Sequence, residues 1–122
     1  MTKAQRPRDE KSGFQSALPA GQALTLHDLV TPTAHGIASR LLVKATGGNV
    51  TLFSFDAGQA LTEHTSAFDA LVLVLEGRFV LTVAGSPIEA TPGTIVRLPA
   101  NVPHAVDAPD ASRMLLVMVR DT

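Results

Sequence analysis

The sequence predicts an all-β fold, either a sandwich or a barrel, formed by a single domain. From Leu24 onward, turn-forming Gly, Pro, Asn and Asp residues separate short apolar stretches at intervals of about 8–12 residues, a spacing typical of such folds. Hydrophobic residues make up 45% of the chain but aromatic residues only 4%, so the core must consist mainly of Leu, Val, Ile and Ala. With 122 residues, the chain is long enough to bury roughly two thirds of the surface that it exposes when unfolded.

The first part of the chain differs from the rest in composition. Six of the 21 charged residues fall within the first eleven positions, and the Ser, Gly, Gln and Pro residues that follow have little to bury. We therefore predict a flexible N-terminal arm over residues 1–20 and a single β-barrel domain over residues 21–122. At the start of this domain, the stretch 24–30, with apolar Leu26, Leu29 and Val30, could form a short helical turn.

The stretches between the turns alternate with a period of two, as strands do. In the stretches 49–55 and 78–83, every second residue points to the same face, and a helical period fits less well. The sequence therefore predicts strands in both places. In the first stretch the two faces consist of Val50, Leu52 and Ser54 on one side and Thr51, Phe53 and Phe55 on the other.

Two further stretches, 70–75 and 114–119, are apolar on both faces. A strand of a small antiparallel barrel normally exposes one face to water, so these strands require a second cover. That cover is either a second copy of the chain or the N-terminal arm folded back, and we expect a homodimer. In the first stretch, the interior set would be Ala70, Val72 and Val74, and the outer set Leu71, Leu73 and Leu75.

Charge and composition exclude several classes of function. The net charge is -1 without a basic stripe, so nucleic acid is not an expected partner. The chain has no cysteine, which excludes disulfides, thiolate metal sites and cysteine nucleophiles. The longest apolar runs have six residues, far short of the roughly 20 needed to span a bilayer. We expect a soluble, cytoplasmic protein with neither nucleic-acid nor membrane partners.

Two motifs carry the chemistry of the chain. The first is "GQALTEHTSAFDALVLVLEG" and the second is "GTIVRLPANVPHAVDA"; each combines at least one glycine, a predicted strand and a histidine. Their informative positions are Gly58, His64, Ser66, Ala70 and Gly77 in the first motif, and Gly93, Pro99, Asn101, His104 and Ala108 in the second.

With these motifs in this order, the chain resembles the cupin family over about residues 36–120. The first family motif contains His-x-His and then Glu, whereas this chain has Ser66 at the second His position and Ala70 at the Glu position. The second family motif contains Pro-x-Gly, then His and then Asn; here Asn101 replaces the glycine and Ala108 stands in place of the asparagine. The motif histidines themselves are present.

The resemblance implies a double-stranded β-helix, or jelly-roll barrel, with a ligand pocket inside and commonly a dimeric state. It is closest in kind to small single-domain bacterial members of the family. In this family the His-x-His pair, the Glu and the later His hold a metal ion. Here His64 and His104 remain as ligands, while Ser66 offers a neutral hydroxyl and Ala70 no donor. Asp69 could replace the missing carboxylate only if a bulge shifted its register.

Three functional hypotheses follow. We favour a small-molecule-binding protein whose pocket surrounds His64 and His104, without an assigned reaction or catalytic residue. The alternative is a metal-dependent enzyme of the dioxygenase or isomerase type, in which His64, His104 and less readily Asp69 hold Fe, Mn, Ni or Zn. The third is a structural or regulatory dimer with a vestigial pocket. Besides the two histidines, the expected ligand-binding residues are Ser66 and, as walls, Phe53, Phe55, Val72 and Val74.

Other side chains have simpler interpretations. Surface or strand-end positions account for His27 and His35, and a solvated strand face accounts for the basic residues. The two late methionines are expected to fill gaps in the core rather than to bind a ligand. The basic residues are Arg40, Lys44 and Arg97, and the methionines are Met114 and Met118.

Overall fold

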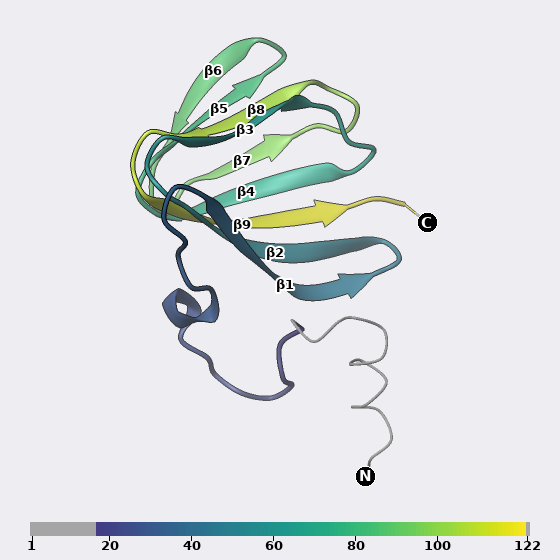
Figure 1. The fold of residues 1–122 in the computed structure, drawn as a ribbon. Helices are drawn as coiled ribbons and strands as arrows, with labels where there is room; N and C mark the ends of the chain where they lie inside the picture. Colours follow the sequence, from purple (N-terminus) through teal and green to yellow (C-terminus); the bar gives the residue numbers. More distant parts are fainter. Residues whose placement is uncertain (1–16, 122) are drawn as a thin grey trace.

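A computed structural model describes residues 17–121. In these residues the chain forms one short 3-10 helix and nine β-strands, labelled in Figure 1. Most of the predicted N-terminal arm, residues 1–16, lies outside the described residues. The elements are η1 (Leu26–Leu29), β1 (Ile37–Ala45), β2 (Gly48–Phe55), β3 (Gln59–His64), β4 (Asp69–Glu76), β5 (Phe79–Val83), β6 (Ser86–Ala90), β7 (Ile95–Leu98), β8 (His104–Ala108) and β9 (Ser112–Val119).

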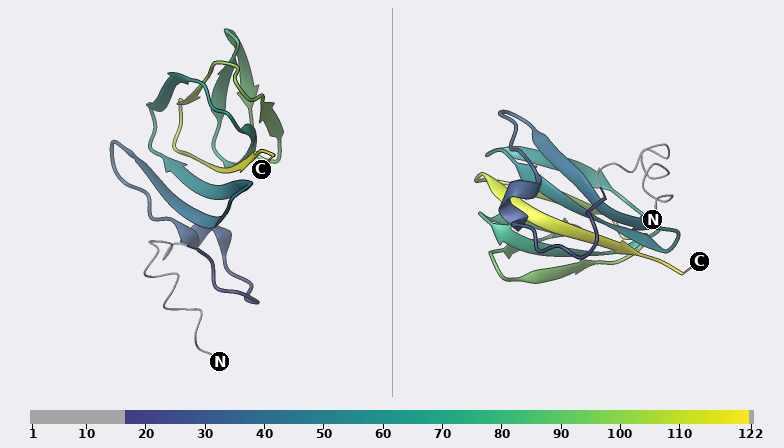
Figure 2. Two further views of the ribbon diagram at one scale, coloured as in Figure 1. Left: turned by 90° about the vertical axis from the view of Figure 1, so that its right-hand side faces the viewer. Right: turned by 90° about the horizontal axis from the view of Figure 1, so that it is seen from below.

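The strands form two antiparallel sheets that face each other. One sheet has the order β1-β2-β9-β4-β7 and the other the order β3-β8-β5-β6. Strands distant in the sequence become neighbours, because β9 lies between β2 and β4, and β8 lies between β3 and β5. Figure 2, in its left view along the barrel, shows the ring that the two sheets make. This is the double-stranded β-helix, or jelly roll, that the sequence predicted.

The main core fills the space between the sheets. In β4, Ala70, Val72 and Val74 are at most 3% exposed, whereas the alternating leucines are half-buried on the outer face. The period-two prediction for this strand is therefore confirmed. On the neighbouring strand β9, Met114 points to the same interior, directly opposite Val74.

The N-terminal segment covers part of the outer face of the larger sheet. Val30, next to η1, packs in a second cluster with Leu42 and Leu52, and Leu75 and Leu115 border this cluster. The predicted helical turn is present as η1. This cover comes from residues that follow the predicted arm, and it supplies part of the protection that the apolar outer face requires.

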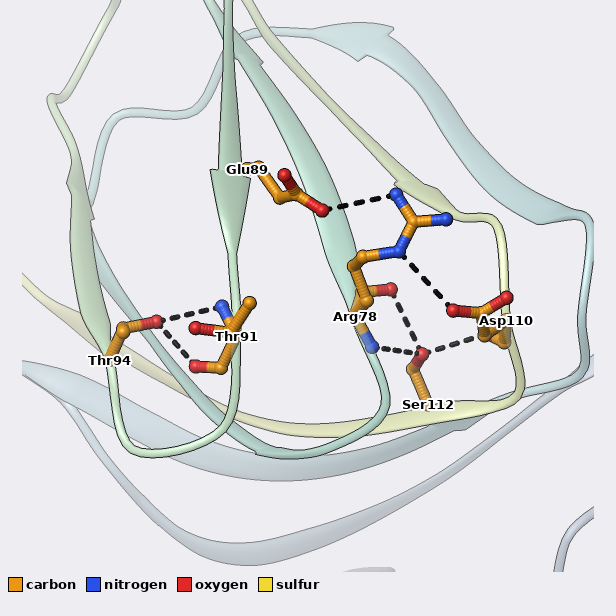
Figure 3. A network of polar contacts seen from close by, with 6 residues as sticks. All are labelled: Arg78, Glu89, Thr91, Thr94, Asp110 and Ser112. Atoms are coloured by element: carbon orange, nitrogen blue, oxygen red, sulfur yellow. Dashed lines mark hydrogen bonds and ion pairs between the residues drawn. The ribbon is translucent and has the colours of Figure 1, made fainter.

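A polar network closes the end of the barrel where β4 turns into β5, as Figure 3 shows. The buried Ser112 hydroxyl accepts a hydrogen bond from the Arg78 backbone N–H at 2.8 Å and lies within donating distance of the Arg78 and Asp110 carbonyl oxygens. The Arg78 guanidinium bridges the carboxylates of Asp110 and Glu89. This network fixes the turn that Gly77 forms with a φ of 77°.

No helix in residues 17–121 is long and apolar enough to cross a membrane.

Candidate functional site

The structure brings His64 and His104 together at one end of the barrel. His64 is the last residue of β3 and His104 the first of β8, and the two are directly paired across these antiparallel strands after a register shift that follows Leu61. Their ring centroids lie 4.5 Å apart with an interplanar angle of 70°. His104 is buried, whereas His64 is exposed at the mouth of the site. Two residues forty positions apart therefore form one imidazole pair.

Backbone carbonyls determine the tautomer of both rings. The Nδ1 atom of His64 lies 2.8 Å from the carbonyl oxygen of Thr62, and the Nδ1 atom of His104 lies 3.1 Å from that of Val102. A carbonyl oxygen can only accept, so each Nδ1 must carry the hydrogen. In the neutral rings each Nε2 atom is then a bare acceptor with its lone pair directed away from the backbone. The pair therefore presents two acceptors.

The turn before β8 positions His104. Asn101, which stands in place of the family's glycine, adopts a φ of 62°, the left-handed conformation that glycine adopts most readily. Its backbone N–H donates to the Ser66 carbonyl oxygen at 2.7 Å, which ties this turn to the segment between β3 and β4. Both segments that flank the imidazole pair are thus held to each other.

Asp69 belongs to this scaffold rather than to the site. Its Oδ1 atom accepts hydrogen bonds from the Ala100 backbone N–H and from Arg97 Nη2, both at 3.0 Å. The Ala100 bond and, after it, the Arg97 side chain hold the pKa of the Asp69 carboxyl below its usual range. Because β4 alternates regularly here, Ala70 faces the interior and Asp69 faces away from it. The bulge that would have turned Asp69 toward His64 is not formed.

Beside the two histidines lies a cavity of about 80 Å³. Its lining is almost entirely aliphatic, and it includes the two positions at which this chain departs from the family's first motif, Ser66 and Ala70. The Ser66 hydroxyl accepts a hydrogen bond from the Phe68 backbone N–H at 3.1 Å. The cavity is lined by Leu61, His64, Ser66, Ala70, Leu98, His104, Val106, Met114, Leu116 and Met118.

The four hydrophobic residues predicted as walls lie elsewhere in the barrel. Phe55, Val72 and Val74 belong to the main core, and the partly buried Phe53 packs against it. None of the four lines this cavity, and Phe55 lines a different hollow. Phe55 stacks edge-on against Phe79 with centroids 5.2 Å apart, so bulky rings occupy the space there. The cavity forms instead beside the small side chain of Ala70.

The residues that replace these walls include the inward face of β9. Met114, Leu116 and Met118, two of which were interpreted as gap fillers, line the cavity. Met118 is paired directly with Ala70, so its side chain lies next to the smallest residue of the lining. The period-two pattern of β9 places these three residues on one face. Only the pairing of β9 with β4 brings that face to the histidines.

The donor atoms at this site do not fit a resident Fe, Mn, Ni or Zn ion. Catalytic sites for such ions generally use three protein ligands. Here two imidazole nitrogens converge, the third position holds the neutral Ser66 hydroxyl, and Ala70 contributes no donor. Among residues 17–121, no three His, Cys, Asp or Glu side chains gather in a way that could hold a metal ion. The cavity is better described as an apolar pocket with two nitrogen acceptors.

A second hollow, of about 260 Å³, lies where η1 meets the barrel. There His27 Nδ1 lies 2.6 Å from Glu76 Oε2, and the buried Arg113 donates through Nη1 to the carbonyl oxygens of His27 and Val30 at 2.8 and 3.3 Å. Arg113 Nε also lies 3.6 Å from Glu76 Oε1. These polar groups attach the N-terminal segment to the barrel. We therefore place the candidate functional site at the imidazole pair, although the second hollow is larger.

Comparison with known families adds an independent line of evidence. A family model described as a cupin domain matches residues 51–120, which include both histidines and most of the strands. This chain belongs to the cupin family.

Solved structures of related proteins agree with this assignment. A conserved protein of unknown function from Streptococcus pyogenes is 32% identical, with a TM-score of 0.81 over 86% of this chain and 92% of that one. A cupin superfamily protein from Desulfitobacterium hafniense is 28% identical, with a TM-score of 0.79 over 85% and 95% of the two chains. A cupin 2 conserved barrel domain protein from Leptotrichia buccalis is 36% identical, with a TM-score of 0.76 over 80% of this chain and 47% of that one. The search of curated proteins gave no match.

Proposed function

We propose that this cupin binds a small, partly apolar molecule inside its barrel, with His64 and His104 as the polar contacts. The observation that carries the proposal is the His104 ring, which belongs to a residue only 6% exposed. Its Nδ1 is bonded to Val102, but its Nε2 has no hydrogen-bond partner within residues 17–121. A buried acceptor without a partner costs about 1–3 kcal/mol, so an occupant that donates a hydrogen stabilises the site.

The shape of the cavity favours a small organic occupant. Aliphatic side chains from five strands line it, and the exposed position of His64 leaves a polar group at its mouth. Ligand sites commonly combine such an apolar wall with a few polar groups that orient the ligand. A molecule with a polar head between the imidazoles and a short apolar tail fits this pattern.

A ligand-observed NMR screen of small neutral fragments tests the proposal. We expect a subset to bind the wild-type chain and to bind His104→Leu at least about tenfold more weakly, because the buried donor–acceptor bond is lost. His27→Gln, which changes a histidine in the second hollow, is the matched control and should bind like the wild type. Equal binding to His104→Leu would contradict the proposal and favour a vestigial pocket in a structural or regulatory dimer.

We also propose that the chain acts as a cytoplasmic homodimer. The outer face of the larger sheet supports the dimer, since Leu71, Leu73 and Val117 are only partly covered there, and Ile95 and Val119 are 57% and 48% exposed. A chain without cysteine has no need of an oxidising compartment, which supports the cytoplasm. Cell fractionation followed by immunodetection checks the location, and a predominantly membrane or secreted fraction would contradict it.

A further inference from the structure

The hydrogen-bonding groups of the cavity can be counted individually. Each imidazole uses Nδ1 to donate to its own strand and leaves Nε2 as an acceptor. The Ser66 oxygen already accepts from Phe68, and its own hydrogen has no partner within residues 17–121. With neutral imidazoles, the cavity therefore offers two acceptors and one donor.

The complement of this set is a neutral head group with two donor hydrogens and one acceptor oxygen. A primary carboxamide has this composition, because its NH₂ group donates twice and its carbonyl oxygen accepts. We propose that the ligands of this cavity are short aliphatic primary amides, with the NH₂ group between His64 and His104 and the carbonyl oxygen facing Ser66. This inference rests on the proposed function and specifies its ligand class.

Head groups of other charge or donor count fit less well. A carboxylate has no hydrogen for either Nε2, and no Lys or Arg side chain lines the cavity to neutralise its charge. An ammonium group donates hydrogens, but no carboxylate lines the cavity to pair with its charge. The nearby Asp69 carboxylate is already engaged by Arg97 and Ala100 outside the cavity. An alcohol donates once, to the buried His104, and leaves the Nε2 of the exposed His64 to water, so it makes one hydrogen bond fewer with the protein than an amide does.

The volume limits the length of the tail. A cavity of about 80 Å³ is roughly half the size of the 150 Å³ cavity that is known to accept benzene, so it encloses only a few non-hydrogen atoms. With the head group at the mouth beside the exposed His64, a tail of two or three carbons reaches the aliphatic wall. Met118 can adapt to small differences in tail shape, because its side chain is flexible.

The test compares matched ligands of nearly equal shape at pH 8. Propionamide, propionate, butan-2-one and propylamine are titrated into the full-length chain, and binding is followed by backbone amide chemical shifts. We expect propionamide to bind at least about tenfold more tightly than the other three, because each of them leaves a buried acceptor unpaired or buries an unpaired charge. Equal or tighter binding of propionate or butan-2-one overturns the inference.

A variant of Ser66 keeps the test informative if His104→Leu fails to fold. Ser66→Ala should weaken propionamide several-fold while leaving butan-2-one less affected, since the ketone already lacks the two donor hydrogens that orient the head group. The exposed Ser86→Ala on β6 is the control and should change neither affinity. If all four compounds bind without preference for the amide, the ligand class is wrong but the cavity still binds small molecules. If none binds and a wider fragment set also fails, the proposed function is wrong.

Discussion

Position 70 decides the chemistry of the cavity at the scale of single residues. The Ala70 side chain is 3% exposed and lies on the cavity wall, as does Ser66, and both stand where the family motif has metal-ligating residues. Two small substitutions thus convert a four-donor site into an apolar pocket with two acceptors. The backbone that would support the full donor set is still present, because the two histidines remain paired across β3 and β8.

We predict that a double variant, Ser66→His with Ala70→Glu, gains a divalent metal site. Without metal, the buried carboxylate should destabilise the fold by about 3 kcal/mol or more. Added Mn²⁺, Ni²⁺ or Zn²⁺ should raise the melting temperature of the variant and leave that of the wild type nearly unchanged. Ala90→Glu, at an equally buried position on β6, is the control and should be destabilised without rescue by metal. A double variant that shows no metal-dependent shift would refute this account.

Gly77 is a second residue at which an added Cβ atom should change the stability of the fold. Its φ is 77°, and a Cβ atom there would lie 2.2 Å from Ser112 Oγ and 2.4 Å from the Ala111 carbonyl oxygen. We predict that Gly77→Ala lowers the free energy of unfolding by at least about 3 kcal/mol, because the network at this end of the barrel must move. Gly85→Ala shares the positive φ but meets no atom within 4 Å, so it should cost only about 1–2 kcal/mol. Urea unfolding of both variants measures the difference, and equal costs would contradict the steric argument.

At the scale of elements, the turn between β7 and β8 holds one of the two imidazoles. Its conformation depends on a carboxylate from the neighbouring strand β4, since Asp69 accepts from both Arg97 and Ala100. The pairing of β4 with β7 brings these groups together, with Leu71 opposite Arg97. The stability of this turn should therefore respond to the ionisation of one acidic side chain.

We predict a pH-dependent stability difference between the wild type and Asp69→Asn. The pKa of the Asp69 carboxyl is lowered in the folded chain from its usual 3.8, so its contribution is fully present above that value and is lost as the pH falls through the lower folded value. The variant should be less stable at pH 7, and the difference should shrink below about pH 4. Urea unfolding of both chains across this range is the measurement. Asp107→Asn, an exposed position on β8, is the control, and a difference for Asp69→Asn that is independent of pH would contradict the assignment.

At the scale of the whole molecule, the larger sheet has an apolar outer face that the N-terminal segment covers only in part. Val30 and its neighbours protect the region around Leu52 and Leu75. Toward β7, Leu73 is paired with Ile95, which is 57% exposed. Contiguous apolar surface of this kind is a common feature of protein–protein interfaces.

We predict that the wild type sediments as a dimer and that Leu73→Arg sediments as a monomer with an intact fold. A guanidinium on this face would be buried without a partner in the dimer, but it would be solvated in the monomer. Asp107→Arg, on the exposed outer side of the other sheet, is the control and should remain a dimer. Analytical ultracentrifugation distinguishes these outcomes, and a monomeric wild type or a dimeric Leu73→Arg would rule out this interface.

The sequence by itself determined the local features of this protein. The alternation of β4 and the helical turn at η1 both follow from short-range patterns, and each is present in the structure. The resemblance of the two motifs to those of the cupin family also implied that His64 and His104 belong to one site. These features were predictable because backbone sterics and side-chain alternation act over a few neighbouring residues.

Only the tertiary structure decided which side chains surround the histidines and what covers the outer sheet. Met114, Leu116 and Met118 reach the cavity because β9 pairs with β4, a contact between segments about forty-five residues apart in the chain. The residues predicted as walls, Phe53, Phe55, Val72 and Val74, do not line the cavity beside the histidines, because large rings fill one region and Ala70 leaves space in another. Strand pairing and packing depend on the burial of the whole chain at once, so no local pattern specifies them.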